Sequence, residues 1–277
     1  MKGWIALDID GTITADKYSV PGPVVSYLSE LQSKGWNLAI ATGRSCAFAL
    51  KVLSTFDFPY RLLVQNGSAV LEMPSKKLIY RRYLSADSIA LMEKAFEGIE
   101  GNFLVYSGIE NGGKCYYRPD RLSKEQREYV TRLEERESEA ACPVETFKAL
   151  RDFPLIKCFG SADEMARLAN RLRQIGIFQV AHIRDPFEEK GQLLLVTDRL
   201  ASKGDTLREM MLQEGRGEKV IAAGDDENDK SLLEQADVKI AMPQAPEVLK
   251  EKADLIAPPV SELGIITALK WAIHDAS

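Results

Sequence analysis

The chain has 277 residues, of which 45% are hydrophobic and 28% charged, and its formal net charge is -5. This composition is ordinary for a globular protein, and the negative charge argues against general affinity for nucleic acid or anionic membranes. No apolar run approaches the ~20 residues of a membrane span, and the first apolar stretch is too short for a signal peptide. The four cysteines form no CxxC pair and only two histidines accompany them, so zinc clusters and disulfide frameworks are poorly supported. We expect a reduced, cytoplasmic protein with neither nucleic-acid nor membrane partners.

The first part of the chain alternates apolar strands with helical stretches. We predict strands at 3–9, at 36–42 and at "RLLVQNG", with helices at 22–34 and 45–56 between them. The C-terminal part repeats this rhythm, with a helix after Lys203, the strand "KVIAAGD" and a helix from about residue 229. Alternation of this kind predicts right-handed βαβ units and a parallel sheet, so both ends of the chain read as halves of one doubly wound α/β domain.

The middle of the chain has a different pattern. Residues 69–81 read as a hairpin, and 85–195 give strand, strand, helix, strand, helix, strand, strand. This order predicts a mixed antiparallel sheet with helices on one face. We therefore expect an inserted α+β domain at 82–190, with the parallel-sheet domain formed by 1–81 and 191–277. A charged helix at 123–139 reads as a solvated face without a functional role.

Two acidic runs follow predicted strands. "DIDGT" carries Asp8 and Asp10, which alternate along an extended chain and so lie on one side, roughly 6 to 7 Å apart. "GDDEND" carries Asp225, Asn228 and Asp229 after the strand at 219–225. The first run alone could be an Asp-Gly turn, and the second alone an acidic turn that caps a helix. Together they are much more specific, because ligands of open parallel sheets bind beyond the carboxyl ends of the strands.

The acidic runs offer only oxygen ligands, which suit a hard cation. Mg²⁺ usually takes one or two carboxylates together with waters and a substrate phosphate. A cation between Asp8, Asp10 and Asp225 would offset the repulsion of these carboxylates and screen a nucleophilic carboxylate from a phosphate dianion. Neither run has the spacing of a calcium-binding EF-hand loop.

Two further clusters suit phosphate binding. In "ATGR", Thr42 offers a hydroxyl, and Gly43 and its neighbours offer backbone N–H groups near a helix start. Lys203 in "SKGDTL" would supply a positive charge at the start of another helix. Each has a plain alternative: Thr42 could simply cap the helix, and Lys203 could be an ordinary surface lysine. The GxxxxGK[ST] pattern does not occur, which argues against P-loop NTPase chemistry.

Taken together, "DIDGT", "ATGR", Lys203 in "SKGDTL" and "GDDEND" resemble, in order, the four motifs of the haloacid dehalogenase-like (HAD) phosphatase superfamily. The large insertion between the second and third motifs looks like the type IIB cap of the Cof-like, sucrose-phosphatase-like and phosphomannomutase-like branches. The resemblance spans nearly the whole chain. It implies a Rossmann-like HAD core with an inserted α+β cap that selects the substrate.

The resemblance also implies roles for individual residues. Asp8 would be the nucleophile that forms an aspartyl-phosphate, and Asp10 the general acid and base. Mg²⁺ would be held by Asp8, the Asp10 carbonyl and Asp225. Thr42, Gly43 and Lys203 would hold the phosphoryl oxygens. Asn228 and Asp229 would position the site from close behind.

Four residues are weaker candidates for substrate contact. Asn66 matches the "NG" that follows the third core strand in the Cof-like branch, although a simple Asn-Gly turn explains it equally well. Arg44 follows the second motif and could equally be a surface arginine. His182 and Arg184 are polar groups of the predicted cap, and His182 could equally face solvent on a strand.

The leading hypothesis is a Mg²⁺-dependent phosphatase, monomeric or homodimeric, that hydrolyses a small phosphorylated metabolite such as a sugar phosphate or a phosphoglycerate derivative. A phosphomutase on the same scaffold is the nearest alternative. A non-catalytic phosphate sensor is an alternative from another class. Asp10 and the cap argue against it, since a module that only stores an aspartyl-phosphate needs neither.

Overall fold

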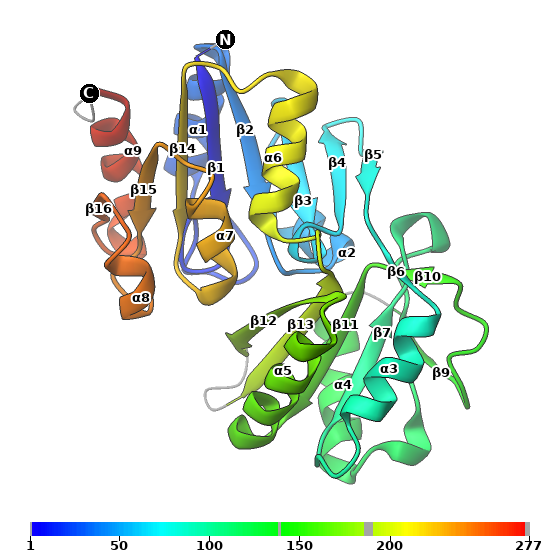
Figure 1. The fold of residues 1–277 in the computed structure, drawn as a ribbon. Helices are drawn as coiled ribbons and strands as arrows, with labels where there is room; N and C mark the ends of the chain where they lie inside the picture. Colours follow the sequence, from blue (N-terminus) through cyan, green and yellow to red (C-terminus); the bar gives the residue numbers. More distant parts are fainter. Residues whose placement is uncertain (1, 138–139, 186–190, 275–277) are drawn as a thin grey trace. The chain divides into compact units, whose positions relative to one another are not determined.

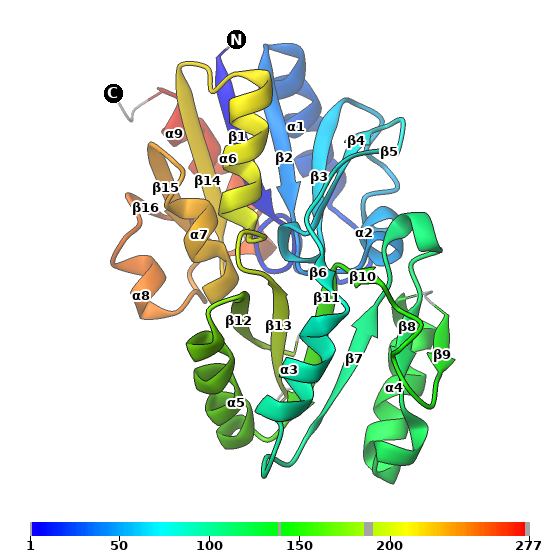
Figure 2. The same ribbon diagram turned by 45° about the vertical axis from the view of Figure 1, so that its right-hand side comes forward.

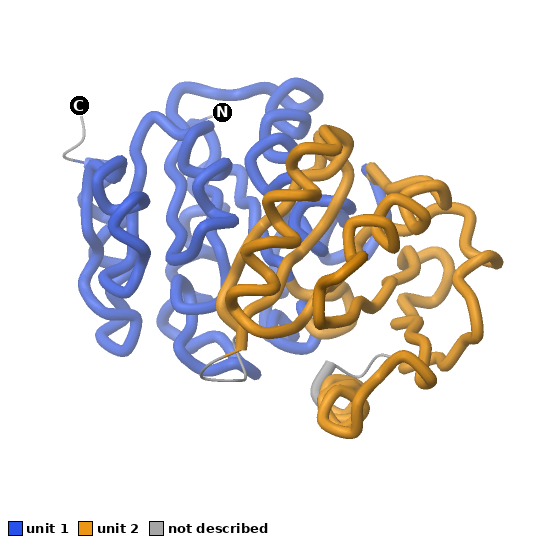
Figure 3. The backbone as a smooth tube through the Cα atoms, turned by 60° about the horizontal axis from the view of Figure 1, so that its bottom comes forward, with its two compact units in different colours: residues 1–43, 49–80, 202–277 blue, residues 44–48, 81–201 orange. Residues whose placement is uncertain are grey.

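The computed structural model describes residues 2–137, 140–185 and 191–274. They divide into two compact units, coloured separately in Figure 3. The first unit comprises 1–43, 49–80 and 202–277, and the second comprises 44–48 and 81–201. Within the described ranges, no helix has both the length and the apolar character needed to cross a membrane.

The first unit is built on an eight-stranded sheet (Figure 1). Six neighbouring strands are parallel, and the last two form an antiparallel extension. In spatial order the strands are β16 (Leu255–Ile256), β15 (Val238–Ala241), β14 (Lys219–Gly224), β1 (Gly3–Asp8), β2 (Trp36–Ala41), β3 (Tyr60–Val64), β4 (Ala69–Met73) and β5 (Lys77–Arg81). Every residue of β1 is buried, as expected for a central strand covered on both faces.

Helices cover both faces of this sheet, as Figures 1 and 2 show. One face carries α6 (Lys203–Glu214) and α7 (Lys230–Leu233), whose apolar residues pack on side chains of β1, β2 and β14. The other face carries α1 (Gly22–Ser33) and α9 (Gly264–His274), with the Lys270 ammonium 5.7 Å from the Tyr27 ring centroid. The remaining helices are α2 (Cys46–Val52) and α8 (Glu247–Lys250). The predicted doubly wound α/β class is confirmed.

The second unit contains a six-stranded sheet in which only β8 and β9 pair in parallel. Its order is β12 (Phe178–Arg184), β13 (Gln192–Asp198), β11 (Leu155–Gly160), β7 (Asn102–Tyr106), β8 (Cys115–Tyr117) and β9 (Ala141–Pro143). A separate two-residue pairing joins β6 (Leu84–Ser85) to β10 (Asp152–Phe153). The predicted mixed antiparallel sheet is therefore present.

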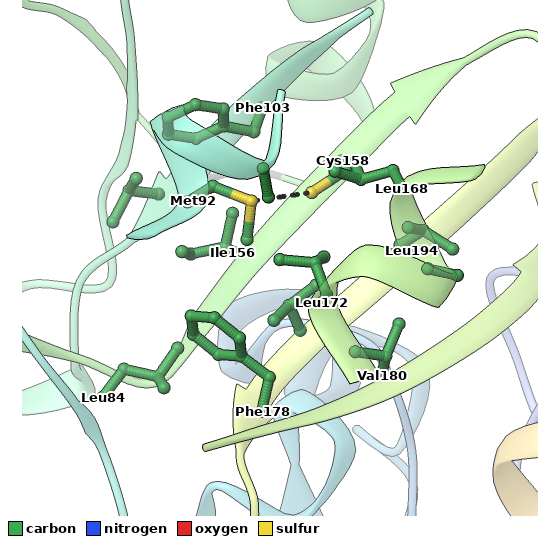
Figure 4. Close-up of a cluster of buried hydrophobic side chains, with 14 of the residues drawn as sticks. Leu84, Met92, Phe103, Ile156, Cys158, Leu168, Leu172, Phe178, Val180 and Leu194 are labelled. Atoms are coloured by element: carbon green, nitrogen blue, oxygen red, sulfur yellow. Dashed lines mark hydrogen bonds between the residues drawn. The ribbon is translucent and has the colours of Figure 1, made fainter. Parts of the chain in front are cut away.

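The helices of the second unit lie on both faces of its sheet, so the prediction of one covered face is wrong. Alternate residues of β11 enter different cores: Ile156 and Cys158 face α3 (Asp87–Ala95) and α5 (Ala162–Ile175). Leu155 and Phe159 face α4 (Lys124–Glu137) instead. Figure 4 shows part of the first of these cores, including the close approach of the Met92 and Cys158 sulfur atoms at 3.9 Å.

Two expectations from the sequence need correction here. The charged helix α4 is not a solvated surface only, because three of its own residues, Tyr129, Val130 and Leu133, are buried against the sheet. Helix α3 is an element that the sequence pattern did not predict. A short helix between two turns has too few periodic residues to stand out from its surroundings.

The ends of the second unit also differ from the predicted insertion. The predicted last residue, 190, lies outside the described residues. The second unit continues to Ala201, because β13 pairs with both β11 and β12. The strand "QLLLVTD" therefore belongs to the smaller sheet, in agreement with the predicted strand order of 85–195, and it is the boundary at 190 that differs.

Candidate active site

The register of the parallel sheet brings the polar strand ends of the first unit together. Asp8, the last residue of β1, pairs with Ala41 at the end of β2. On its other side β1 pairs with β14, with Leu7 level with Ala223. Thr42 and Asp225 therefore leave the sheet at the same edge as Asp8. This edge is also the topological switch point, since the chain passes from β1 to β2 on one side and reaches β14 on the other much later.

Lys203 lies between two carboxylates at this edge. Its Nζ donates hydrogen bonds to Asp8 Oδ1 and to Asp229 Oδ1, each at 2.6 Å. All three side chains are almost completely buried. The Ser202 side chain accepts a hydrogen bond from the Asp205 N–H and caps α6, so this helix begins at Lys203 and presents the lysine at its first position.

Asp225 completes a group of three carboxylates. One oxygen each of Asp8, Asp225 and Asp229 lies within 4.8 Å of the others. Gln244, after β15, donates from Nε2 to Asp225 Oδ2 at 3.0 Å and to the Gly11 carbonyl at 2.7 Å. Gly11 has φ of +73°, and a Cβ there would lie 2.3 Å from Asp225 Oδ2, so only glycine suits this turn.

The charges of this group do not balance. Three carboxylates face one ammonium group, which leaves two negative charges in excess when all are ionised. Burial and then the charge of Asp229 raise the pKa of Asp8 well above its usual value. Burial and Asp229 raise the pKa of Asp225 to about 7. Burial by itself would lower the pKa of Lys203, but the adjacent Asp229 and Asp8 outweigh this and raise it.

The donor set fits a hard divalent cation. Asp8 Oδ2 is buried and has no hydrogen-bond partner among the described residues, which is costly for a carboxylate oxygen. All the candidate ligand atoms are oxygens, and the excess of two negative charges matches one divalent ion. An all-oxygen set without histidine or thiolate argues for Mg²⁺ over zinc.

The sequence predicted that Asp229 supports the site from behind, but the structure places its carboxylate in direct contact with Lys203 and within the group of three carboxylates. It bonds Lys203 through Oδ1, while its Oδ2 accepts from the backbone N–H groups of Asp225 at 2.9 Å and Asp226 at 3.1 Å. One carboxylate therefore orients both the lysine and the acidic loop. Its side chain is completely buried, so these bonds are not exchanged with water.

The turn after β3 links three parts of the site. Asn66 Oδ1 accepts from Asn228 Nδ2 at 3.3 Å, and the Asn66 N–H donates to the Thr42 carbonyl at 2.9 Å. The Gly67 carbonyl accepts from Thr206 Oγ1 on α6 at 2.6 Å. Gln65, Asn66 and Gly67 all have positive φ, at 51°, 58° and 93°. Strained backbone of this kind persists only where its surroundings hold it, and it is frequent at functional sites.

The structure brings most of the predicted core residues to one place, with one difference in detail at Gly43. Thr42 is buried directly after β2, and Asp10 lies two residues beyond β1 in an isolated bridge with Thr14. Helix α2 begins at Cys46, so Gly43 lies in the loop before the helix and not at its first turn. The backbone N–H groups that were expected to bind an anion at a helix N-terminus therefore lie in the loop before α2.

Three weaker candidates belong to the second unit, whereas the carboxylate group belongs to the first. The Arg44 guanidinium lies over the Phe48 ring, with its carbon 4.1 Å from the centroid. His182 pairs with Leu194 in the β12–β13 ladder, and its Nε2 has no hydrogen-bond partner among the described residues. Arg184 is exposed at the end of β12.

Sequence reasoning missed Gln244 and Thr206. Gln244 follows a strand of the parallel sheet, so the rule that ligands gather at carboxyl strand ends could have identified it. Thr206 lies one helical turn after Lys203 and reads as an ordinary helix residue. Its role depends on the Gly67 carbonyl, 139 residues away, and no local signal predicts that contact.

Comparison with known proteins agrees with this geometry. The family model for haloacid dehalogenase-like hydrolases matches residues 5–269. The chain is 25% identical over 283 residues to a phosphoglycolate phosphatase of Methanopyrus kandleri, covering 99% of each protein. It is 23% identical over 270 residues to the 5-amino-6-(5-phospho-D-ribitylamino)uracil phosphatase YcsE of Bacillus subtilis, covering 97% of this chain and 95% of YcsE.

The fold has solved counterparts as well. The HAD subclass IIB sugar phosphatase BT4131 superposes with a TM-score of 0.74 at 20% identity, covering 97% of this chain and 98% of BT4131. The chain belongs to the haloacid dehalogenase-like hydrolase family and has its type IIB fold. The predicted enzyme class, a phosphatase, is confirmed.

Proposed function

We propose that the protein is a Mg²⁺-dependent phosphatase that hydrolyses a small phosphorylated metabolite, a sugar phosphate or a phosphoglycerate-type acid, through an aspartyl-phosphate. The observation that carries the proposal is the state of Asp8. Lys203 holds one of its carboxylate oxygens, and the other is buried without a partner. An oriented carboxylate with one unsatisfied oxygen is suited to act as a nucleophile.

In the first step the free oxygen of Asp8 attacks phosphorus, and the bond from phosphorus to the leaving oxygen breaks. Asp10 gives its proton to that oxygen, so the alcohol leaves neutral. In the second step Asp10 takes a proton from a water molecule, which attacks phosphorus and releases inorganic phosphate and Asp8. Splitting the reaction in this way replaces one difficult displacement by two easier ones.

The other residues would hold the phosphoryl group while these steps proceed. Lys203 has three N–H groups, and two donate to Asp8 and Asp229, which leaves one for a phosphoryl oxygen. The Thr42 hydroxyl and the backbone N–H groups near Gly43 would bind the other oxygens. Mg²⁺ would be held by Asp8, the Asp10 carbonyl and Asp225, and it would neutralise part of the phosphate charge.

The two named relatives support the substrate class. The archaeal protein acts on a phosphorylated two-carbon acid, and YcsE acts on a phosphorylated ribityl compound, according to their names. Both are small metabolites that carry one phosphomonoester. This agrees with a site whose assigned residues address the phosphate and leave the rest of the substrate to other residues.

The test is a screen for phosphate release with Mg²⁺ over phosphoglycolate, phosphoglycerates and sugar phosphates. Asp8→Asn serves as the blank and Asp57→Asn, an exposed aspartate of the same unit, as the matched control. We expect Asp8→Asn to lower kcat by about 10⁴-fold or more for every substrate. Full activity in Asp8→Asn would overturn the covalent mechanism. Conversion of a sugar phosphate into its isomer, without release of inorganic phosphate, would indicate the phosphomutase alternative.

A further inference from the structure

The second unit contains a cavity of about 320 Å³ that the proposed function does not use. It lies beside the C-terminal end of α3, between the following loop, β7 and the segment after β8 (Figure 2 shows these elements). This volume is within the range of small-molecule sites. Its lining includes two acidic, two basic and three apolar side chains together with one amide, namely Glu93, Glu97, Arg118, Arg121, Phe96, Ile99, Phe103 and Asn102.

Arg118 is the central polar group of this cavity. Its side chain is only 11% exposed and ion-pairs with Glu93. The guanidinium carbon lies 5.0 Å from the Phe103 ring centroid and 4.8 Å from that of Phe147, so two aromatic faces hold it in place. Its Nε is buried and has no acceptor among the described residues. A buried N–H without an acceptor is unfavourable, and a bound acceptor would satisfy it.

The walls of the cavity are fixed by hydrogen bonds. Arg171 on α5 donates to the carbonyls of Ala95 at 2.9 Å and Glu97 at 2.6 Å, which holds the loop after α3. Asn102 Nδ2 donates to the Arg121 carbonyl at 2.6 Å, which holds the segment that carries the second arginine. The cavity is therefore preformed, so a ligand would not have to order these segments on binding.

One wall is apolar. Ile99 and Phe103 are buried, and the rings of Phe96 and Phe103 pack with their centroids 5.5 Å apart. Phe103 also belongs to the core cluster shown in Figure 4, as Met92 does. An apolar wall supported by a packed core offers a firm surface for a hydrocarbon side chain.

The charges of the cavity indicate the chemistry of its ligand. Two arginines favour a carboxylate, and a guanidinium binds carboxylates with good geometry. Glu93 and Glu97 favour an ammonium group, and so does the C-terminal end of α3, because the last carbonyls of a helix carry partial negative charge. A ligand that carries a carboxylate, an ammonium group and an apolar side chain therefore matches the arginines, the glutamates and the apolar wall.

We propose that this cavity binds a free α-amino acid with an apolar side chain. Its carboxylate meets Arg118 and Arg121, its ammonium meets Glu93 and Glu97, and its side chain packs against Ile99 and Phe103. The site lies entirely within the second unit and uses none of the residues assigned to phosphate hydrolysis. The inference therefore holds or fails independently of the proposed function.

The test is isothermal titration calorimetry of the full chain with L-leucine and L-phenylalanine. Two analogues of leucine each lack one charge: 4-methylpentanoate lacks the ammonium and 3-methylbutylamine lacks the carboxylate. We expect saturable binding of at least one amino acid at a ratio of one per chain, and at least tenfold weaker binding of both analogues. Absence of binding at millimolar amino acid, or equal binding of the analogues, would overturn the proposal.

Variants locate the site. Arg118→Gln is expected to weaken binding at least tenfold, but it also removes a side chain packed between two rings. Arg121→Gln and Glu97→Gln avoid this problem, because both side chains are exposed at the rim, and each is expected to weaken binding three- to tenfold. Arg151→Gln and Glu128→Gln are matched controls on exposed positions of the same unit and should bind as the original chain does. Unchanged binding in both rim variants would place the ligand elsewhere and refute the proposal.

Discussion

The two units bury different kinds of side chains beside their sheets. At the carboxyl ends of its strands, the first unit buries Lys203 between Asp8 and Asp229. The second unit packs apolar side chains against both faces of its sheet, and even its most buried thiol, Cys158, lies next to a methionine. The comparison teaches that the first unit depends locally on charge balance, whereas the second depends on apolar burial. Four predictions test this difference, from the largest expected effect to the smallest.

The largest effect is expected for Lys203→Met. It removes the ammonium group that pairs with both buried carboxylates, and breaking a buried pair in this way typically costs about 3–5 kcal/mol. We expect a loss of this size in urea unfolding at pH 8 in EDTA, with phosphate release reduced about 10³-fold or more. Lys77→Met, at an exposed position of β5, is the control and should differ by less than about 0.5 kcal/mol. Equal stability of the two variants would contradict the importance of charge balance.

The second effect is stabilisation by Mg²⁺. A ligand that binds only the folded state at 100 times its Kd adds about 2.7 kcal/mol. Because the pKa of Asp225 is raised from 3.8 to about 7, ionising this carboxylate opposes folding. Without metal, its contribution should therefore make stability fall as pH rises from about 4 to about 7. Protons compete with the metal for this carboxylate below about pH 7, so we expect Mg²⁺ to raise Tm more at pH 8 than at pH 6.

Differential scanning fluorimetry with Mg²⁺ or EDTA measures this effect. Asp225→Asn is expected to lose most of the Mg²⁺-dependent rise in Tm, and Asp57→Asn to keep it. A larger rise at pH 6 than at pH 8 would show that the buried carboxylates do not hold the metal.

A smaller effect is expected for Thr206→Val. This change keeps the shape of the side chain but leaves the Gly67 carbonyl without its 2.6 Å donor, which typically costs about 1–3 kcal/mol. Because Gly67 belongs to the turn that also contacts Asn228 and Thr42, kcat should fall as well. Thr131→Val in the second unit removes an exposed bond to the Arg127 carbonyl and should change stability by less than about 0.5 kcal/mol. Similar losses in both variants would argue against a special role for this turn.

The smallest effect concerns the thiols of the second unit. Cys158 is completely buried, and burial raises the pKa of its thiol, so almost none is present as thiolate. Cys142 is partly exposed. Under native conditions we expect iodoacetamide to label Cys142 at least 10³-fold faster than Cys158, as measured by peptide mass spectrometry. Labelling of Cys158 at the rate of Cys142 would show that the apolar core of this unit opens readily.

The sequence predicted the class of fold and most members of the site because both depend on local patterns. Apolar runs such as "WIAL" and "KVIAAG" indicate buried strands, and the polar residues that follow them must lie at one edge of a parallel sheet. Asp8, Thr42 and Asp225 could be grouped on this ground alone. The strand at 192–198 was harder to assign, because an apolar strand does not reveal which of two sheets it joins.

What the sequence by itself determined, then, is which apolar runs form buried strands of the parallel sheet and which polar residues end them, and these polar residues are the candidates for phosphate chemistry. Only the tertiary structure decided which side chains meet. Lys203 contacts Asp8 across 195 positions, Asn228 contacts Asn66 across 162, and Arg118 packs between two rings of the second unit. These contacts depend on strand order and register, which bring distant segments together, and hydrophobic periodicity carries no information about that pairing.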